Sequence, residues 1–420
     1  MYLTAKAKIP ELVQLKEIGN ICTKIWNKAN YYCRQQWEQT GKIPSYYELQ
    51  RIFKDDFWCR QVHSHTAQAV LHKLAESYSS WFQLRKADAT ANPPMFRKKD
   101  SISTVTFTNF AIRINGAQME LTLKKGTHVQ LNYQLQPNVE ITQKNIVRIE
   151  VKHGFANIVY RVEEPPLKQS GQVMGIDLGV VNTAITVKED GEARIYTGRS
   201  LLSTQRYFNK EIGRVQSIVM AQSKGKKKWS RQLSELARKR TRQVRHILHT
   251  QTKAIVDDCV ESGVNVVAVG DLHNIRKLRS DTKKPEKLVK ARSWGRVNNQ
   301  KNHAWSFSWF TATLTYKLRR EGILLVQVNE KSTSKTCCRC GETRKRNRKT
   351  RGLYICNRCG LRINADVNGA VNILSKYLQP LGRSSANVNL TKVIKWNKNH
   401  LSLEALPFKV GSSLKCVELP

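Results

Sequence analysis

Four cysteines near the end of the chain limit what this region can fold into more than any other feature of the sequence. Cys337 and Cys340 form one C-x2-C pair, and Cys356 and Cys359 form a second pair after fifteen intervening residues. Two such pairs, one near each end of a hairpin, supply the four thiolates of a tetrahedral structural zinc site. Zinc then provides folding energy that so short a hairpin lacks. The spacing therefore predicts a zinc-held hairpin with these four cysteines as ligands.

The excess of basic residues indicates the kind of partner that the chain binds. Its 420 residues include 72 Lys and Arg against 32 Asp and Glu, a formal net charge of +40. A charge of this size favours a polyanionic partner, and we expect nucleic acid rather than a membrane surface. No apolar run approaches the roughly 20 residues of a spanning helix, and the first residues lack the apolar stretch of a signal peptide. With its scattered cysteines, the chain is predicted to be cytoplasmic, in the prokaryotic cytosol or nucleoid.

The first 165 residues change from a strand to helices and then to short strands. Residues 2–9 alternate in polarity, residues 11–92 have helical periodicity, and six short alternating runs follow between residues 105 and 162. We expect an antiparallel β-barrel formed by residues 1–10 and 93–165, with residues 11–92 inserted as a helical bundle. Aromatic residues between 31 and 58 suit either the core of that bundle or stacking on bases, and the first interpretation is favoured.

From residue 172 the pattern is that of an α/β domain. Runs of strand and helix periodicity follow in the order β-β-β-α-β-α-β, then the cysteine hairpin, then a final helix. This order predicts a central mixed sheet, formed by residues 172–332 and 362–376, with residues 333–361 inserted as a zinc ribbon. Residues 377–420 are rich in Pro, Gly, Ser and Asn, and we expect a disordered tail.

Basic residues are concentrated in two stretches of this second half. Residues 224–245 hold ten Lys and Arg and one acid, and residues 276–301 hold ten against two acids. Such a run is often only a solvated helix face, but its length and single sign favour contact with nucleic acid. The predicted nucleic-acid contacts are Lys226, Lys227, Lys228, Arg231, Arg238, Lys239 and Arg240.

Two acids have the positions of metal ligands. Asp177 lies in an otherwise apolar strand, where a carboxylate is costly unless it is paired or binds a metal; the alternative is an exposed acid at the strand end. Asp366 lies at the start of the last helix, where an acid can cap the helix or bind metal. Phosphodiester hydrolysis by two divalent ions needs acidic ligands that converge from separate elements.

Several motifs, taken together and in order, resemble one nuclease family. They are Gly175-Ile176-Asp177-Leu178-Gly179, Thr333-Ser334-Lys335-Thr336-Cys337-Cys338-Arg339-Cys340-Gly341, Cys356-Asn357-Arg358-Cys359-Gly360 and Asn364-Ala365-Asp366-Val367-Asn368-Gly369-Ala370. They resemble the RuvC-type, RNase H-like nuclease domain of TnpB (OrfB family), transposon-encoded RNA-guided DNA endonucleases ancestral to type V CRISPR effectors. The resemblance implies a wedge barrel and a recognition bundle that hold a guide RNA and double-stranded target DNA. It also implies two Mg²⁺ or Mn²⁺ ions, Asp177 and Asp366 as ligands, and a monomer, although shorter CRISPR relatives pair.

The sequence departs from the family pattern at one ligand. The family places Glu-Asp-Leu at the end of its fourth strand, where this chain has Gly270-Asp271-Leu272. Glu330, just past the neighbouring fifth strand, is predicted to replace the missing ligand, so that Asp177, Glu330 and Asp366 bind Mg²⁺. The alternatives are a solvated Glu330 in a nuclease-dead, RNA-guided DNA-binding protein, and a miniature type V CRISPR effector. A plain zinc-ribbon DNA-binding factor does not account for Asp177 or the α/β domain.

Overall fold

The computed structural model describes residues 1–135, 139–225, 229–272, 300, 306–350, 352–383, 390–397 and 400–406. The chain divides into two compact units, Met1–Glu163 and Glu164–Pro420. Each unit mixes helices and sheets, which agrees with the predicted multidomain α+β class. None of the helices in the described ranges is both long and apolar enough to cross a membrane.

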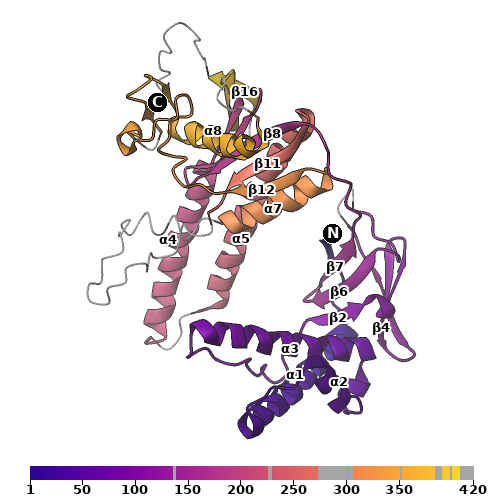
Figure 1. Ribbon diagram of the computed structural model, residues 1–420. Coiled ribbons are helices and arrows are strands. Elements are labelled where there is room, and N and C mark those ends of the chain that lie inside the picture. The colour runs from indigo at the N-terminus through magenta and orange to yellow at the C-terminus, as the bar shows by residue number, and fades with distance from the viewer. Residues whose placement is uncertain are drawn as a thin grey trace. The chain divides into compact units, whose positions relative to one another are not determined.

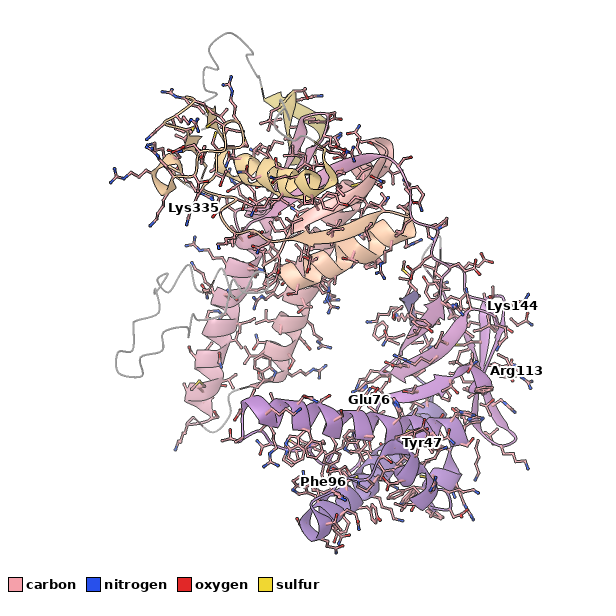
Figure 2. The ribbon with its side chains drawn as sticks, in the orientation of Figure 1. Tyr47, Glu76, Phe96, Arg113, Lys144 and Lys335 are labelled. Carbon is pink, nitrogen blue, oxygen red and sulfur yellow. The ribbon has the colours of Figure 1, made fainter. Side chains whose placement is uncertain are left out.

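The helical part of the first unit contains α1 (Val13–Thr40), α2 (Tyr46–Ile52) and α3 (Ser64–Ala87). Apolar residues at helical spacing on α1 and α3 pack into one core that is continuous with the strands of this unit. Most of the aromatic residues considered for base stacking belong to this core or pack against it. Tyr31, Tyr47 and Phe57 are exposed instead, and Figure 2 labels Tyr47.

The strands of the first unit form two sheets. The four-stranded sheet has the order β1-β7-β6-β2, and the three-stranded sheet has the order β3-β4-β5. Their bounds are β1 (Tyr2–Lys8), β2 (Val105–Thr108), β3 (Ile112–Asn115), β4 (Gln118–Lys124), β5 (Thr127–Asn132), β6 (Ile146–Lys152) and β7 (Phe155–Arg161). Every predicted strand is present, because the alternation and the turns specify each hairpin. The predicted closed barrel is not confirmed, since the described strands form two separate sheets. An isolated bridge joins Lys8 of β1 to Gln134, two residues after β5 ends.

The second unit is built on a seven-stranded mixed sheet with the order β12-β11-β8-β9-β10-β15-β16. Strands β12, β11 and β8 are parallel to one another, and β9 and β10 continue the sheet antiparallel to β8. The bounds are β8 (Gln172–Leu178), β9 (Asn182–Lys188), β10 (Glu192–Thr197), β11 (Val264–Gly270), β12 (Leu324–Val328), β15 (Lys392–Asn397) and β16 (His400–Leu406). The predicted mixed sheet is therefore present.

Helices cover both faces of this sheet. Helix α8 (Ala365–Leu378) packs on one face, while α5 (Arg231–Glu261) and α7 (Phe307–Arg320) pack on the other (Figure 1). Helix α4 (Arg199–Gln222) packs along α5. This order of helices agrees with the sequence pattern, with one difference. The single helical stretch expected between β10 and β11 is divided into two helices, α4 and α5.

The prediction of a disordered tail is wrong for part of residues 377–420. Strand β15 pairs parallel to β10, from Glu192 with Lys392 to Tyr196 with Trp396, and β16 pairs with β15. The sequence pattern missed this pairing because β10 and β15 are separated by almost 200 residues of chain. Trp396 also packs its ring against Tyr196 at 5.5 Å, so the tail contributes to the core of the second unit.

Candidate metal centres

The carboxyl ends of three parallel strands meet at one edge of the sheet in the second unit. Val269 of β11 pairs with Ile176 of β8, and Gly270 pairs with Val328 of β12. Asp177 is the next residue on β8, and Glu330 follows two residues after β12 ends. The carboxyl edge of a parallel sheet is where α/β proteins commonly bind their ligands. The fold therefore brings Asp177 and Glu330 to the same edge from positions 153 residues apart.

The side chain of Glu330 lies in the space that a side chain at position 270 would fill. A Cβ atom added to Gly270 would meet Glu330 Oε1 at 1.9 Å and its Cδ at 2.6 Å. Only glycine leaves room for the Glu330 carboxylate over the end of β11. The glycine at position 270 thus makes the room that the Glu330 side chain occupies.

Asp177 is held against α8 by two glycines that let the helix approach β8 closely. A Cβ on Gly175 would meet Leu374 Cβ at 2.7 Å, and a Cβ on Gly369 would meet Asp177 Oδ2 at 2.6 Å. Burial raises the pKa of Asp177 well above its usual range, and Glu330 and Asp366 raise it further. Asp177 therefore lies near two other acids in a site that disfavours its charge.

Asp366 approaches the same place from the first turn of α8. Asn364 is the N-cap residue and accepts from the backbone N–H of Asp366 at 2.9 Å. The capping role considered for Asp366 therefore belongs to Asn364. The Asp366 carboxylate accepts instead from Asn182 Nδ2 at 3.1 Å and from Arg348 of the cysteine hairpin at 2.9 Å.

The surroundings of Glu330 also disfavour its charged form. Burial raises the pKa of Glu330 to about 7, Asp271 raises it as well, and Lys376 opposes the effect. Its Oε1 atom is buried without a hydrogen-bond partner among the described residues. Asp271, the residue after Gly270, therefore lies near the site as an additional exposed acid.

These observations fit a site for divalent cations. A cation would satisfy the unpartnered Glu330 oxygen and relieve the repulsion on Asp177. Within the described part of the chain, only the four cysteines bring three or more possible ligand atoms within 4.8 Å of one another, so the three carboxylates do not meet at one point. Ligands spaced more widely than this are compatible with two ions, which catalytic pairs hold roughly 3.5–4 Å apart.

The predicted zinc ligands lie together at the cysteine hairpin. Cys337, Cys340, Cys356 and Cys359 form the four-sulfur cluster, with Sγ–Sγ distances of 3.6 Å from Cys337 to Cys359 and 3.5 Å from Cys340 to Cys356. A tetrahedron with Zn–S bonds of about 2.3 Å has edges of about 3.8 Å. The sulfurs therefore fit Zn²⁺ closely. The neighbouring Cys338 is not part of the cluster, as the spacing predicted.

The predicted nucleic-acid contacts lie mainly on α5. Arg231, Arg238 and Lys239 are exposed, while Arg240 is half-buried. Arg231 and Arg238 share Glu235 as an ionic partner, and Glu235 is the one acid among the residues of this stretch that the structure describes. Lys226, Lys227 and Lys228, and nearly all of the basic stretch 276–301, lie outside the described residues.

A basic pocket of about 470 Å³ in the first unit was missed by the sequence analysis. Lys73, Arg97, Lys98 and Lys152 line it together with hydroxyl and apolar residues, and no acid contributes to its wall. Arg97 lies 3.9 Å from the centre of the Trp26 ring and donates to Ser103 Oγ at 2.6 Å. Burial disfavours the charged guanidinium of Arg97 and lowers its pKa. A bound anion would offset this cost, so the pocket favours an anionic ligand. The four cations are dispersed in the sequence, which explains why composition alone did not reveal them.

Two family models match parts of the chain, and several known proteins are similar to it. Residues 157–276 match the OrfB_IS605 model, described as "Probable transposase", and residues 307–373 match the Cas12f1-like TNB domain. The TnpB-like protein ORF457 of Acidianus two-tailed virus is 24% identical over 407 residues, covering 86% of this chain and 83% of the relative. The "Putative RNA-guided DNA endonuclease InsQ" of Escherichia coli (strain K12) is 24% identical over 377 residues, covering 86% of this chain and 88% of the relative.

A solved structure agrees with the fold. The cryo-EM structure of a Cas12f1–sgRNA–target DNA complex has a TM-score of 0.53 at 16% identity, and covers 86% of this chain and 81% of that one. The fold and the site together define a multidomain α+β protein with an acidic sheet edge beside a four-cysteine hairpin. By these comparisons the chain is similar to TnpB-like proteins along most of its length, and residues 307–373 match the Cas12f1-like TNB domain.

Proposed function

We propose that this chain is an RNA-guided DNA endonuclease of the TnpB type, which hydrolyses guide-matched DNA with divalent metal ions. The single observation that carries the proposal is the position of Glu330. Its carboxylate fills the space over Gly270 at the carboxyl edge of the sheet, beside Asp177. A chain that had simply lost the acid of its fourth strand would have no reason to supply another at the same point in space.

Asp177, Glu330 and Asp366 are the proposed ligands of two Mg²⁺ or Mn²⁺ ions. Asp177 is influenced electrostatically by both Glu330 and Asp366 and is therefore the proposed shared ligand. When bound, the ions would activate a water molecule and neutralise the leaving oxygen of the phosphodiester. Asn182 would orient the Asp366 carboxylate through its hydrogen bond, while the Arg348 guanidinium pairs with the same carboxylate and would compete with an ion for it.

The basic surfaces are the proposed contacts with guide RNA and target DNA. Sequence in such complexes is read by base pairing with the guide, so the protein needs to bind backbone and shape. The exposed cations of α5, the basic residues of the zinc hairpin and the acid-free pocket of the first unit all suit phosphates. Zn²⁺ on the four cysteines is proposed as the structural ion that maintains the hairpin beside Asp366.

The test is cleavage of plasmid DNA by the purified chain, expressed with its flanking non-coding DNA so that its own guide transcript is bound. We expect Mg²⁺-dependent cleavage by the wild type, and a loss of at least about 1,000-fold in Asp177→Ala and Glu330→Ala. Glu321→Gln, which alters an exposed acid at the end of α7, is the matched control. All variants should retain guide RNA.

Glycine at position 270, where the resemblance implies a glutamate ligand, favours one alternative. This alternative is an RNA-guided DNA-binding protein without nuclease activity. In that case the wild type would bind guide-matched DNA and never cut it at any Mg²⁺ concentration. Cutting by the wild type together with loss in Glu330→Ala would exclude this alternative. Cutting that survives Glu330→Ala would instead remove Glu330 from the proposed ligand set.

A further inference from the structure

Three polar residues follow one face of helix α8, whose other buried residues are apolar. Asn368, Asn372 and Lys376 are four residues apart, so they project from the same side of the helix. Asn368 and Asn372 are buried. Burial of an amide is costly unless its hydrogen bonds are satisfied, so this face must bind a partner of matching polarity.

The partner is the segment 329–338, here called the strap, which connects Glu330 with the first cysteine pair. Lys376 Nζ donates to the carbonyl oxygens of Asn329 at 3.0 Å and Lys331 at 2.5 Å, the two residues that flank Glu330. Asn372 Nδ2 donates to the carbonyl oxygens of Thr333 at 2.8 Å and Thr336 at 2.7 Å.

The third member of the face binds the strap where it enters the cysteine hairpin. Asn368 Nδ2 donates to the Thr336 carbonyl at 2.8 Å, and Asn368 Oδ1 accepts from the backbone N–H of Cys338 at 3.0 Å. All of these bonds are made to the strap backbone. The helix therefore fixes the path of the strap, whatever side chains the strap carries.

The strap needs such support because part of it is strained. Ser332 has φ of +70°, a left-handed conformation that is unfavourable for a residue with a side chain. A conformation of this kind persists only where the surrounding contacts over-determine it. The bonds from Lys376 and Asn372 lie on either side of Ser332 and supply those contacts.

We propose that Asn368, Asn372 and Lys376 are positioning residues. Lys376 positions the Glu330 carboxylate by donating hydrogen bonds to the backbone carbonyl oxygens on both sides of Glu330. The same helix carries Asp366 in its first turn and Gly369 against Asp177. Helix α8 therefore helps to position all three proposed ligands, and the zinc hairpin is bound to the same helix through the backbone of Cys338. This inference rests on the proposed function, since it assigns a purpose to the place of Glu330.

The test compares Lys376→Met with Lys376→Arg, which keeps a charged donor, in the full chain. Lys331→Met is the control. It removes a nearby positive charge but leaves the hydrogen bonds from α8 to the strap backbone in place. Two quantities are measured: hydrogen exchange of strap peptides, and the MgCl₂ concentration that gives half of the maximal thermal stabilisation. Lys376→Gln serves as a milder variant if Lys376→Met does not fold.

We expect Lys376→Met to accelerate exchange in the strap at least tenfold and to raise the Mg²⁺ midpoint about tenfold, with Lys376→Arg and Lys331→Met within about twofold of the wild type. Unchanged strap exchange in Lys376→Met would overturn the inference, and so would an unchanged Mg²⁺ midpoint in a chain that binds Mg²⁺. A wild type that Mg²⁺ does not stabilise would refute the proposed function instead, and the exchange measurement would still decide whether Lys376 holds the strap.

Discussion

Replacing Gly270 with alanine is the perturbation whose effect follows most directly from the packing around Glu330. The new Cβ would lie 1.9 Å from Glu330 Oε1, a distance that no pair of non-bonded atoms tolerates. The carboxylate must therefore move by about 1.5 Å, from 1.9 Å to the 3.4 Å of an ordinary van der Waals contact. The side chain is flexible at this end, so it can move without disturbing the backbone.

The displacement is small for folding and large for catalysis. A misplacement of about 1 Å in a catalytic group can reduce the rate about 100-fold, which corresponds to roughly 2.7 kcal/mol of transition-state stabilisation. We therefore expect Gly270→Ala to cut DNA at least about 100-fold more slowly than the wild type. Its free energy of unfolding should change by less than about 1 kcal/mol, since no buried contact is lost.

The assay is single-turnover cleavage of guide-matched DNA at saturating Mg²⁺, with guide binding measured in parallel. Gly213→Ala is the matched control, because a Cβ on Gly213 of α4 would meet nothing within 4 Å. The double change Gly270→Glu with Glu330→Gly returns a carboxylate to the vacated space, and it should cut faster than Glu330→Gly alone. Wild-type cleavage by Gly270→Ala would refute the reasoning, because it would show that the observed place of Glu330 has no part in the reaction.

Three further predictions concern stability and metal binding. In the metal-free chain, burial is the main reason that the pKa of Glu330 is raised from 4.5 to about 7. The wild type therefore loses stability as the pH rises through this range, whereas Glu330→Gln does not. Urea unfolding should find the variant roughly 2 kcal/mol more stable than the wild type at pH 8 and equally stable at pH 4, and equal stability at both pH values would contradict the pKa shift. Cys356→Ser should lose the bound zinc while Cys338→Ser keeps one ion per chain, as measured by elemental analysis; zinc retained by both would exclude the four-thiolate site. Arg348→Ala removes a cation that competes for Asp366, so the Mg²⁺ midpoint of thermal stabilisation should fall about threefold, and a rise would mean that Arg348 supports ion binding.

Local pattern was sufficient for most elements of this fold. The alternation and the Gly-containing turns specify every strand of the first unit, and the order of strands and helices specifies the mixed sheet of the second. Pairings between distant segments were less accessible. The pairing of β15 with β10 and the separation of the first unit into two sheets depend on contacts that no local periodicity encodes.

The site could be predicted as a set of residues but not as an arrangement. Spacing identified the four cysteines, and an acid in an apolar strand identified Asp177. The fit of Glu330 over Gly270 depends on β11 and β12 being parallel neighbours, which the sequence only suggested. The polar face of α8 did leave a signal, since Asn368, Asn372 and Lys376 recur every fourth residue of an apolar helix, and its purpose becomes visible only with the strap in place.

The central claim is that Asp177, Glu330 and Asp366 share bound divalent ions at the carboxyl edge of the sheet. Anomalous diffraction from crystals of the guide-bound chain soaked in MnCl₂ tests this most directly. The account predicts two manganese peaks, both within ligand distance of Asp177, one also contacting Glu330 and the other Asp366. A single peak that leaves out Glu330, or no peak at this edge, would contradict it.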